Sequence, residues 1–247
     1  MVKRMAPIKA DFCPNKKPFP KIPLSKSSSN CDRARERFQK ELSILKRLSD
    51  LFSKPKPAYV LNGSAALHFI FLGKRIPSDI DLRCDDVEAT RKALSNRFEE
   101  VPRSTTVPVY GFLDENGVLI DLSQNQFLRT RKTFVANPTS PNLFKDHSTP
   151  VFSYDFEVLF AEKLIALTRK RDLKDLFDAH SCLSRPVDLA RVMLNLKEIA
   201  GVDGIDLLTL ASPSYVLDGG LGGVVPASQT TPEEMLAKVQ SFVRSLI

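Results

Sequence analysis

Hydrophobic residues recur at intervals of three and four residues in the segment that begins near Asp32. This spacing places them on one face of a helix, which we expect to run from Asp32 to about Lys54, where the sequence KPKP ends it. The apolar face consists of Phe38, Leu42, Leu45, Leu48 and Phe52. Residues 1–30 are rich in proline, lysine and serine without such a period, and we expect them to be extended or weakly ordered.

The following segment alternates between short apolar runs and an amphipathic stretch. We expect a strand, a buried helix, a second strand and an amphipathic helix over residues 58–63, 64–73, 78–84 and 85–100. The last of these has an acidic first turn, which suits the dipole of a helix. The order of elements is typical of a mixed α/β domain.

Residues 107–124 alternate between apolar and polar positions on both sides of Asn116-Gly117. This dipeptide is the strongest short turn signal in the chain, so the segment predicts a β-hairpin. Residues 130–150 contain three prolines and are expected to form a loop.

Helical periods dominate the rest of the chain, over residues 155–180, 187–200 and 232–246. A mixed α/β part followed by a mostly helical part indicates the α+β class. We therefore expect a basic N-terminal arm over residues 1–30, a sheet-containing domain over 31–150 and a helical domain over 151–247.

The chain has 247 residues, enough for one large domain or two small ones with a sizeable core. No apolar run of about 18 residues is present, so we expect no membrane span. The first residues lack the apolar core of a secretory signal. The four cysteines form no CxxC pair and favour reduced thiols in a cytoplasmic protein.

The net charge of +7 is concentrated at one end of the chain. Residues 1–30 carry seven basic side chains and one acidic side chain, a net of +6, whereas the other 217 residues carry 29 basic and 28 acidic ones, a net of +1. Two interpretations of this arm stay open, a segment that contacts phosphates and a solubilising tail without a partner.

Asp79 and Asp81 lie two residues apart in the expected strand over 78–84. Side chains at this spacing share one face, about 6.5–7 Å apart along the strand. Ile80 and Leu82 would then point into the core. The pair can hold divalent cations as an anchored carboxylate face, or it can be the solvated face of an edge strand.

Gly63 and Ser64 end one expected strand and open the next helix. Glycine lets the backbone approach a ligand closely, and the N-terminus of a helix favours phosphate. Ser64 can donate to a phosphate oxygen, cap the helix, or do both. Together with the two aspartates, the pair fits one site for a triphosphate and its Mg²⁺.

Asp121 lies on the returning arm of the hairpin, on the face opposite Val118, Ile120 and Leu122. If its strand lies beside the Asp79–Asp81 strand, Asp121 can complete a carboxylate cluster or act as the base for an incoming hydroxyl. An exposed strand aspartate is the alternative.

Lys163 lies on or beside the apolar stripe of its predicted helix, three residues after Phe160. A lysine in this position must extend its ammonium to solvent or pair with an anion such as a phosphate. Both interpretations fit the spacing.

Three aspartates recur every third residue among four basic residues in RKRDLKDLFDAH, residues 169–180. The spacing alone favours a surface helix with ion pairs between neighbouring turns. The aspartates are Asp172, Asp175 and Asp178.

In this order, NGSAALHFIFLGKRIPSDIDL, LIDLS, AEKLIAL and RDLKDLFD resemble the AbiEii-type nucleotidyltransferases, toxins of type IV toxin–antitoxin systems within the polymerase-β-like superfamily. The resemblance runs from about Leu61 to about His180. Asn62 and Pro77 depart from it, because the family usually has glycine and serine there.

The resemblance implies a polymerase-β-like nucleotidyltransferase fold with a mixed sheet, followed by a helical domain. It implies that Gly63, Ser64 and Lys163 bind the triphosphate of an NTP, and that Asp79 and Asp81 ligate Mg²⁺. It further implies that Asp172 or Asp175 completes the cleft and is catalytic. Asp121 is the candidate third carboxylate.

The resulting hypothesis is a Mg²⁺-dependent enzyme that transfers an NMP from an NTP to an acceptor hydroxyl. By resemblance the acceptor is RNA, such as tRNA, and a cognate antitoxin is the expected protein partner. Two alternatives are a nucleotidyltransferase for a small-molecule or protein hydroxyl, and a non-catalytic nucleotide-binding protein of the same fold.

Overall fold

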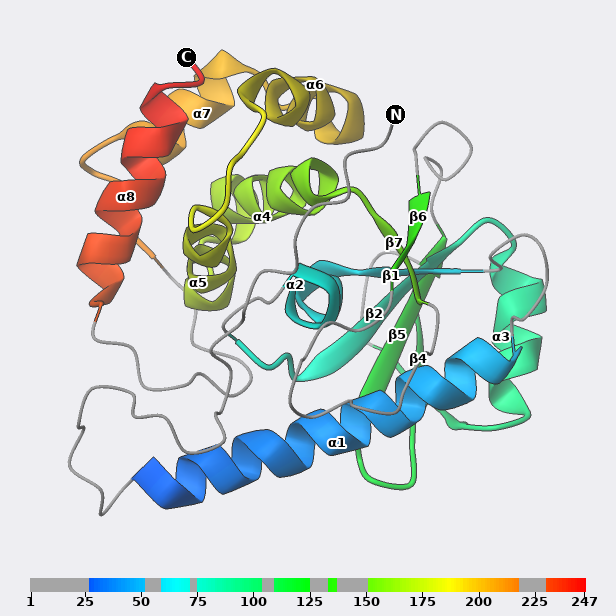
Figure 1. Ribbon diagram of the computed structural model, residues 1–247. Helices are drawn as coiled ribbons and strands as arrows, with labels where there is room; N and C mark the ends of the chain where they lie inside the picture. The colour runs from blue at the N-terminus through cyan, green and yellow to red at the C-terminus, as the bar shows by residue number, and fades with distance from the viewer. Residues whose placement is uncertain are drawn as a thin grey trace, which may run out of the picture.

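The computed structural model describes residues 27–51, 59–71, 75–103, 109–124, 133–136, 151–217 and 230–247. A strand-rich part is followed along the chain by a group of helices (Figure 1). Most of the expected basic arm, the KPKP sequence and most of the 130–150 segment lie outside the described residues. The expected α+β class is confirmed.

Seven described strands form one mixed sheet in the order β3-β4-β5-β2-β1-β7-β6. Their bounds are β1 (Val60–Asn62), β2 (Asp79–Cys84), β3 (Glu99–Val101), β4 (Val109–Leu113), β5 (Leu119–Gln124), β6 (Thr133–Ala136) and β7 (Val151–Tyr154). The β2/β5 and β1/β7 pairs are parallel, and the remaining pairs are antiparallel. The parallel β2/β5 pair is the one that places two aspartate-bearing strands side by side.

The described helices fall into two groups along the chain, three before strand β4 and five after strand β7. Their bounds are α1 (Ser27–Leu51), α2 (Gly63–Phe71), α3 (Val87–Ser95), α4 (Phe156–Lys170), α5 (Leu173–Cys182), α6 (Leu189–Ala200), α7 (Gly204–Ala211) and α8 (Pro232–Arg244). Helix α2 packs on β1 and β2, and α3 packs on β4 and β5. Helix α4 packs on α2 as well as on α5, α6 and α7, so it joins the C-terminal helices to the sheet.

Helix α1 is longer at its start than its hydrophobic period predicts, because it begins at Ser27 rather than near Asp32. Its apolar face is confirmed for Phe38, Leu42, Leu45 and Leu48, which are buried, while Phe52 lies outside the described residues. Phe38 stacks on Phe69 of α2 with ring centroids 5.1 Å apart. Four residues of the expected arm, 27–30, therefore belong to a helix that packs against the sheet portion.

The hairpin is confirmed as β4 and β5, with Gly117 at φ 73° in its turn. Three short strands and one helix were not predicted: β3, β6, β7 and α7. The helix expected over 85–100 is wrong at its end, because α3 ends at Ser95 and β3 begins at Glu99. The loop expected over 130–150 is wrong at β6, which pairs with β7. Because β7 belongs to the sheet, the sheet portion extends to Tyr154, four residues past the expected domain boundary.

The helical period over 155–180 is interrupted at Arg171, whose left-handed backbone (φ 55°) ends α4. Helix α5 then begins at Leu173, with Asp172 at its N-cap. The break turns the chain back, and α4 and α5 pack on each other. This arrangement brings the aspartates of α5 next to the lysine of α4.

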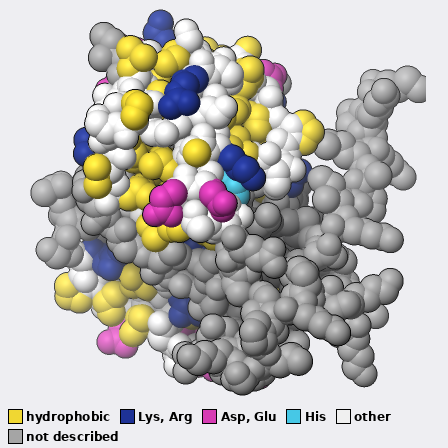
Figure 2. Space-filling model, turned by 90° about the vertical axis from the view of Figure 1, so that its left-hand side faces the viewer, with side chains coloured by type: hydrophobic (Ala, Val, Ile, Leu, Met, Phe, Trp, Pro, Cys, Tyr) yellow, Lys and Arg dark blue, Asp and Glu magenta, His cyan; other side chains and the backbone are white. Residues whose placement is uncertain are grey.

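Apolar side chains lie among scattered charged ones on the side of the molecule near α8 (Figure 2). Both signs of charge occur among the described side chains there, so this side offers no continuous basic surface in the described residues. Leu194, Leu208 and Val216 are among the most exposed large apolar side chains.

None of the described helices is both long and apolar enough to span a membrane. Cys84 and Cys182 are buried and without disulfides.

Candidate active site

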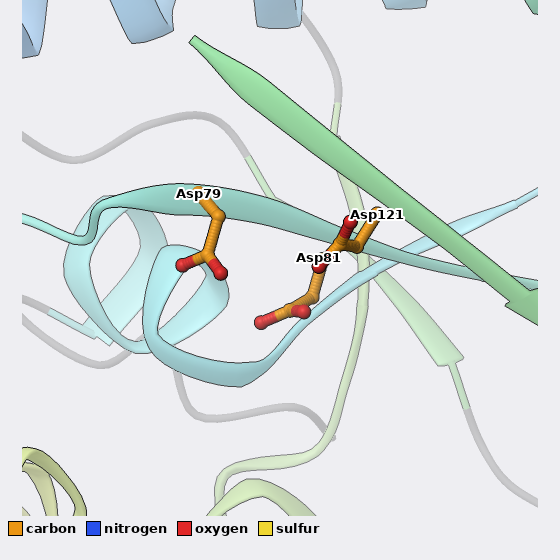
Figure 3. A group of neighbouring side chains, drawn as sticks. All are labelled: Asp79, Asp81 and Asp121. Atoms are coloured by element: carbon orange, nitrogen blue, oxygen red, sulfur yellow. The ribbon is translucent and has the colours of Figure 1, made fainter. Parts of the chain in front are cut away.

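Three aspartates from two neighbouring strands meet on one face of the sheet. Asp81 of β2 and Asp121 of β5 are direct partners in the parallel register, and Asp79 precedes Asp81 on the same face. Each offers a carboxylate oxygen, and these oxygens lie within 4.8 Å of one another (Figure 3). We call Asp79, Asp81 and Asp121 the carboxylate triad.

The alternation of side chains along β2 and β5 explains why the triad forms. Ile80, Leu82, Ile120 and Leu122 are completely buried, which fixes the register of both strands from the core side. The aspartates between them must then point to the opposite face. The predicted proximity of Asp121 to the other two aspartates is confirmed.

The triad concentrates negative charge in a poorly hydrated place. Burial and then the charge of Asp79 raise the pKa of Asp81 to about 7, although Lys163 and Arg83 oppose the shift. Burial also raises the pKa of Asp121, with Arg103 opposing. Within the described residues Asp121 Oδ1 is buried without a hydrogen-bond partner. Ionising these groups together is costly, and a bound cation would remove that cost.

Gly63 is needed beside the triad for a steric reason. Its φ is 59°, and a Cβ in its place would overlap Oδ2 of Asp81. Glycine therefore permits both the turn from β1 into α2 and the close approach of the Asp81 carboxylate. The preceding Asn62 pairs with Asp81 across β1 and β2 and is 2% exposed. Its Oδ1 has no hydrogen-bond partner in the described part of the chain.

A second cluster, which we call the buried ionic network, lies where α2 meets α4 and α5. Ser64 Oγ donates to Asp178 Oδ2 at 2.5 Å and accepts from Lys163 Nζ at 3.0 Å and from Arg75. Lys163 Nζ also lies 2.9 Å from Asp175 Oδ1 and 3.0 Å from Asp178 Oδ2. Arg75 donates to both carboxylate oxygens of Asp178, at 3.0 and 2.8 Å.

The charges of the network compensate one another. Burial penalises the ammonium of Lys163, but Asp178 and Asp175 outweigh the penalty and raise its pKa. Burial likewise penalises the carboxylate of Asp178, but Lys163 and Arg75 outweigh it and lower its pKa to about 2. The side chains of Arg75 and Asp178 are only 2% and 6% exposed. Lys163 and Asp178 are therefore ionised at neutral pH.

The structure decides between the interpretations of Lys163 and the α5 aspartates. Lys163 is buried and pairs with anions, so extension of its ammonium to solvent is wrong. Asp175 and Asp178 are buried, so the surface-helix interpretation is wrong for both. Asp172 is partly exposed (26%), but it is the N-cap of α5 and lies 4.0 Å from Lys174, only two residues away, so it forms no ion pair between neighbouring turns there.

Residues near the site that were not predicted include Arg75, Arg103, Glu41 and Asp178. Arg75 follows α2 in a segment whose charges look solvated in the sequence. Arg103 lies just after β3 and pairs with Asp121 at 2.5 Å. Glu41 is a charged residue of α1, but its side chain is completely buried. No sequence period distinguishes Arg75 and Arg103 from surface charges, whereas Glu41 lies three residues after Phe38 and four before Leu45, on the apolar face of α1.

Glu41 ties α1 to the start of β2. Arg37 donates to Glu41 Oε1 at 2.7 Å and to the backbone carbonyl of Ser78, the residue before Asp79. Burial raises the pKa of Glu41 to about 8, with Arg37 opposing and Asp79 adding to the rise. Helix α1 therefore helps to position the first aspartate of the triad.

Comparison with known proteins identifies the fold. The sequence pattern of the AbiEii nucleotidyl transferase toxins of type IV toxin–antitoxin systems matches residues 43–212. Among solved structures, MenT4, the nucleotidyltransferase toxin Rv2826c from Mycobacterium tuberculosis H37Rv, has a TM-score of 0.62 at 16% identity, with 87% of each chain covered. JHP933 from Helicobacter pylori has a TM-score of 0.52 at 16% identity and covers 87% of this chain and 92% of its own.

A search of curated protein sequences gives no match. The two solved structures share the fold, and the family pattern covers the triad, Lys163 and the whole of α5. The chain therefore belongs to the AbiEii family of type IV toxin–antitoxin systems and is a nucleotidyltransferase.

Proposed function

We propose that the protein is a Mg²⁺-dependent toxin enzyme that transfers an NMP from an NTP to a hydroxyl of an RNA acceptor, such as tRNA. The carboxylate triad is the observation that carries this proposal. Its oxygens lie within 4.8 Å of one another beside the N-terminus of α2. Membership of a toxin–antitoxin family also implies a cognate antitoxin as a protein partner. We expect the protein to act in the cytoplasm.

The residues of the triad fit a hard divalent cation. Carboxylate oxygens are the protein ligands that Mg²⁺ prefers. Asp121 Oδ1 is buried and has no hydrogen-bond partner among the described residues, which is the state expected of an oxygen kept for a ligand. When bound, the ion would neutralise phosphate charge and polarise the phosphoryl group under attack.

The residues around the triad have separate proposed tasks. The first turn of α2 at Gly63 and Ser64 would present backbone N–H groups to the phosphates. The Ser64 proton is committed to Asp178, so this hydroxyl holds the network rather than a phosphate in the present arrangement. Lys163 Nζ donates to Ser64 and Asp175 and lies 3.0 Å from Asp178 Oδ2, so a phosphate contact requires that it release one of these partners.

Asp175 is the better candidate of the two α5 aspartates carried over from the family. It holds Lys163 at 2.9 Å, whereas Asp172 lies at the N-cap of α5, 4.0 Å from Lys174. We propose that Asp175 acts through Lys163, and we expect a smaller role for Asp172.

The proposed reaction forms one phosphorus–oxygen bond for the one that it breaks. The acceptor oxygen bonds to the α-phosphorus, and the bond from that phosphorus to the bridging oxygen breaks. Pyrophosphate leaves, and the hydroxyl proton goes to solvent water, because Asp121, with Oδ2 on Arg103 and Oδ1 kept for the cation, is proposed as a ligand rather than as this base. The net charge of +6 on residues 1–30 supports an anionic acceptor.

A transfer assay tests the proposal. The full chain is incubated with each labelled NTP and Mg²⁺, either with total tRNA or with a cell extract freed of RNA. We expect label on tRNA only, and no transfer by Asp79→Ala or Asp81→Ala. Label on a protein or small molecule in the RNA-free extract would replace the RNA acceptor, and full activity of both variants would remove the triad from the mechanism.

A further inference from the structure

One line of paired residues crosses five strands of the sheet at the candidate site. In the order of the strands β3, β4, β5, β2 and β1 the line consists of Val101, Gly111, Asp121, Asp81 and Asn62. Two members of the triad lie at its centre. Arg103 follows the β3 member of the line by two residues, just past the end of that strand.

Arg103 reaches the triad across β4. Its Nη2 lies 2.5 Å from Asp121 Oδ2, and the two side chains are 30% and 14% exposed. The alkyl part of Arg103 passes over Gly111, because a Cβ added at that glycine would lie 2.7 and 2.8 Å from Cδ and Cγ of Arg103. A side chain at position 111 would therefore displace the arginine from this path.

The contact divides the two oxygens of Asp121 between two tasks. Oδ2 accepts from the guanidinium, while Oδ1 is buried and has no hydrogen-bond partner among the described residues. A hydrogen bond to one oxygen restricts rotation of a carboxylate and so fixes the direction of the other. Partners that orient metal-binding groups in this way govern metal affinity and activity in many proteins.

We propose that Arg103 is a positioning residue for nucleotidyl transfer, which fixes Asp121 so that Oδ1 is presented to a divalent cation, and that Gly111 is a glycine because Arg103 crosses it. This inference rests on the proposed function of the triad as a metal site. Arg103 lies outside the sequence motifs that resemble the family, and it acts through Asp121 rather than on the substrate.

A plain surface ion pair is the competing explanation, and such pairs contribute little. It accounts for the distance between Arg103 and Asp121 but not for the glycine beneath the arginine. It also makes a different prediction. Loss of one positive charge near three carboxylates would leave cation binding unchanged or make it tighter.

The test measures Mn²⁺ binding to the full chain by titration calorimetry, together with labelled-NMP transfer. For Arg103→Ala we expect Mn²⁺ affinity to fall by about tenfold or more, with transfer falling in parallel. Arg103→Lys should recover part of both losses, because it keeps a charge that can reach Asp121 without the planar fork of arginine.

Gly111→Ala is the matched variant, because it removes no charge. Its methyl group should displace Arg103 and weaken Mn²⁺ binding about as much as Arg103→Ala does. In the double variant, which combines Arg103→Ala with Gly111→Ala, there is no arginine to displace. Its Mn²⁺ affinity should therefore equal that of Arg103→Ala alone. If Gly111→Ala does not fold in a thermal melt, the comparison of Arg103→Ala with Arg103→Lys still decides the question.

Arg91→Ala is the charge control. Arg91 pairs with Glu88 and Glu100 on the surface, and its loss should leave Mn²⁺ binding as in the wild type. Mn²⁺ affinity that is unchanged or tighter in Arg103→Ala would overturn the inference, provided that Asp81→Asn loses binding. Wild-type Mn²⁺ affinity in Asp81→Asn would instead contradict the metal site itself, and with it the proposed function.

Discussion

The carboxylate triad and the buried ionic network lie next to each other but solve opposite electrostatic problems. The triad gathers Asp79, Asp81 and Asp121 with one described cation, Arg103, paired to them. The network balances Lys163 and Arg75 against Asp175 and Asp178. An unbalanced cluster costs stability and is suited to a ligand that supplies the missing charge, whereas a balanced cluster holds two parts of the fold in place.

The pKa shifts express this contrast in physical terms. Burial and Asp79 raise the pKa of Asp81 to about 7, so its carboxylate is disfavoured in the folded protein. Lys163 and Arg75 overcome the effect of burial on Asp178 and lower its pKa to about 2, so its carboxylate is favoured. Removing a negative charge should consequently have opposite effects on stability at the two places.

Asp178→Ala should have the largest effect on stability. It leaves Arg75 without its paired carboxylate and removes one of the two anions at Lys163, in a place that is 6% exposed. Breaking a buried pair in this way costs about 3–5 kcal/mol of the free energy of unfolding. Urea denaturation at neutral pH measures it, and a loss below about 1 kcal/mol would show that the network is not a balanced unit.

Asp81→Asn should break function while sparing the fold. The amide removes a carboxylate whose ionisation is disfavoured, so the melting temperature without divalent metal should stay the same or rise. Labelled-NMP transfer should fall at least about a hundredfold. A clear loss of stability in metal-free buffer would mean that the charges of the triad are balanced, as those of the network are.

Acidification should remove the stabilising contribution of Asp178. Asp178 has a folded pKa of about 2 against an ordinary value of 3.8, so its contribution to stability is complete above the unfolded value. The contribution is lost as pH falls through the folded value, and it amounts to about 2 kcal/mol. Unfolding of the wild type and Asp178→Asn at pH values between 5 and about 2 checks this, because the gap between the two should close towards low pH. A gap of constant size would contradict it.

Asp172→Asn should have the smallest effect. Asp172 is partly exposed, and its distance to Lys174 is as long as 4.0 Å. Exposed pairs of this kind contribute about 0–1 kcal/mol to stability. Transfer activity should stay within about threefold of the wild type, since a change of that size is under 1 kcal/mol. A loss comparable to that of Asp175→Asn in the same assay would restore Asp172 as a functional equal of Asp175.

The two regions also differ in how well the sequence predicts them. Asp79, Asp81 and Asp121 follow from the alternation of strands β2 and β5, since Ile80 and Ile120 fix which face is buried. The hairpin around Gly117 sets the register of β4 and β5. Local patterns therefore predicted the triad, and only the pairing of β2 with β5 had to be assumed.

The network does not follow from local patterns, because its members are far apart in the sequence. Ser64 is separated from Asp178 by 114 positions, and Arg75 from the same aspartate by 103. The period of residues 169–180 suggested a solvated helix, and it did not reveal that α4 and α2 cover two of its aspartates. The break at Arg171 decides this, and a left-handed arginine has no strong sequence signal.

The most direct test of the account is Mn²⁺ binding to three forms of the full chain: the wild type, Asp81→Asn and Asp175→Asn. Both substitutions replace one carboxyl group by an amide, one in the triad and one in the network. Asp81→Asn should lose Mn²⁺ binding, whereas Asp175→Asn, in which Lys163 keeps Asp178, should bind it as the wild type does. Retained binding in Asp81→Asn together with lost binding in Asp175→Asn would contradict the account.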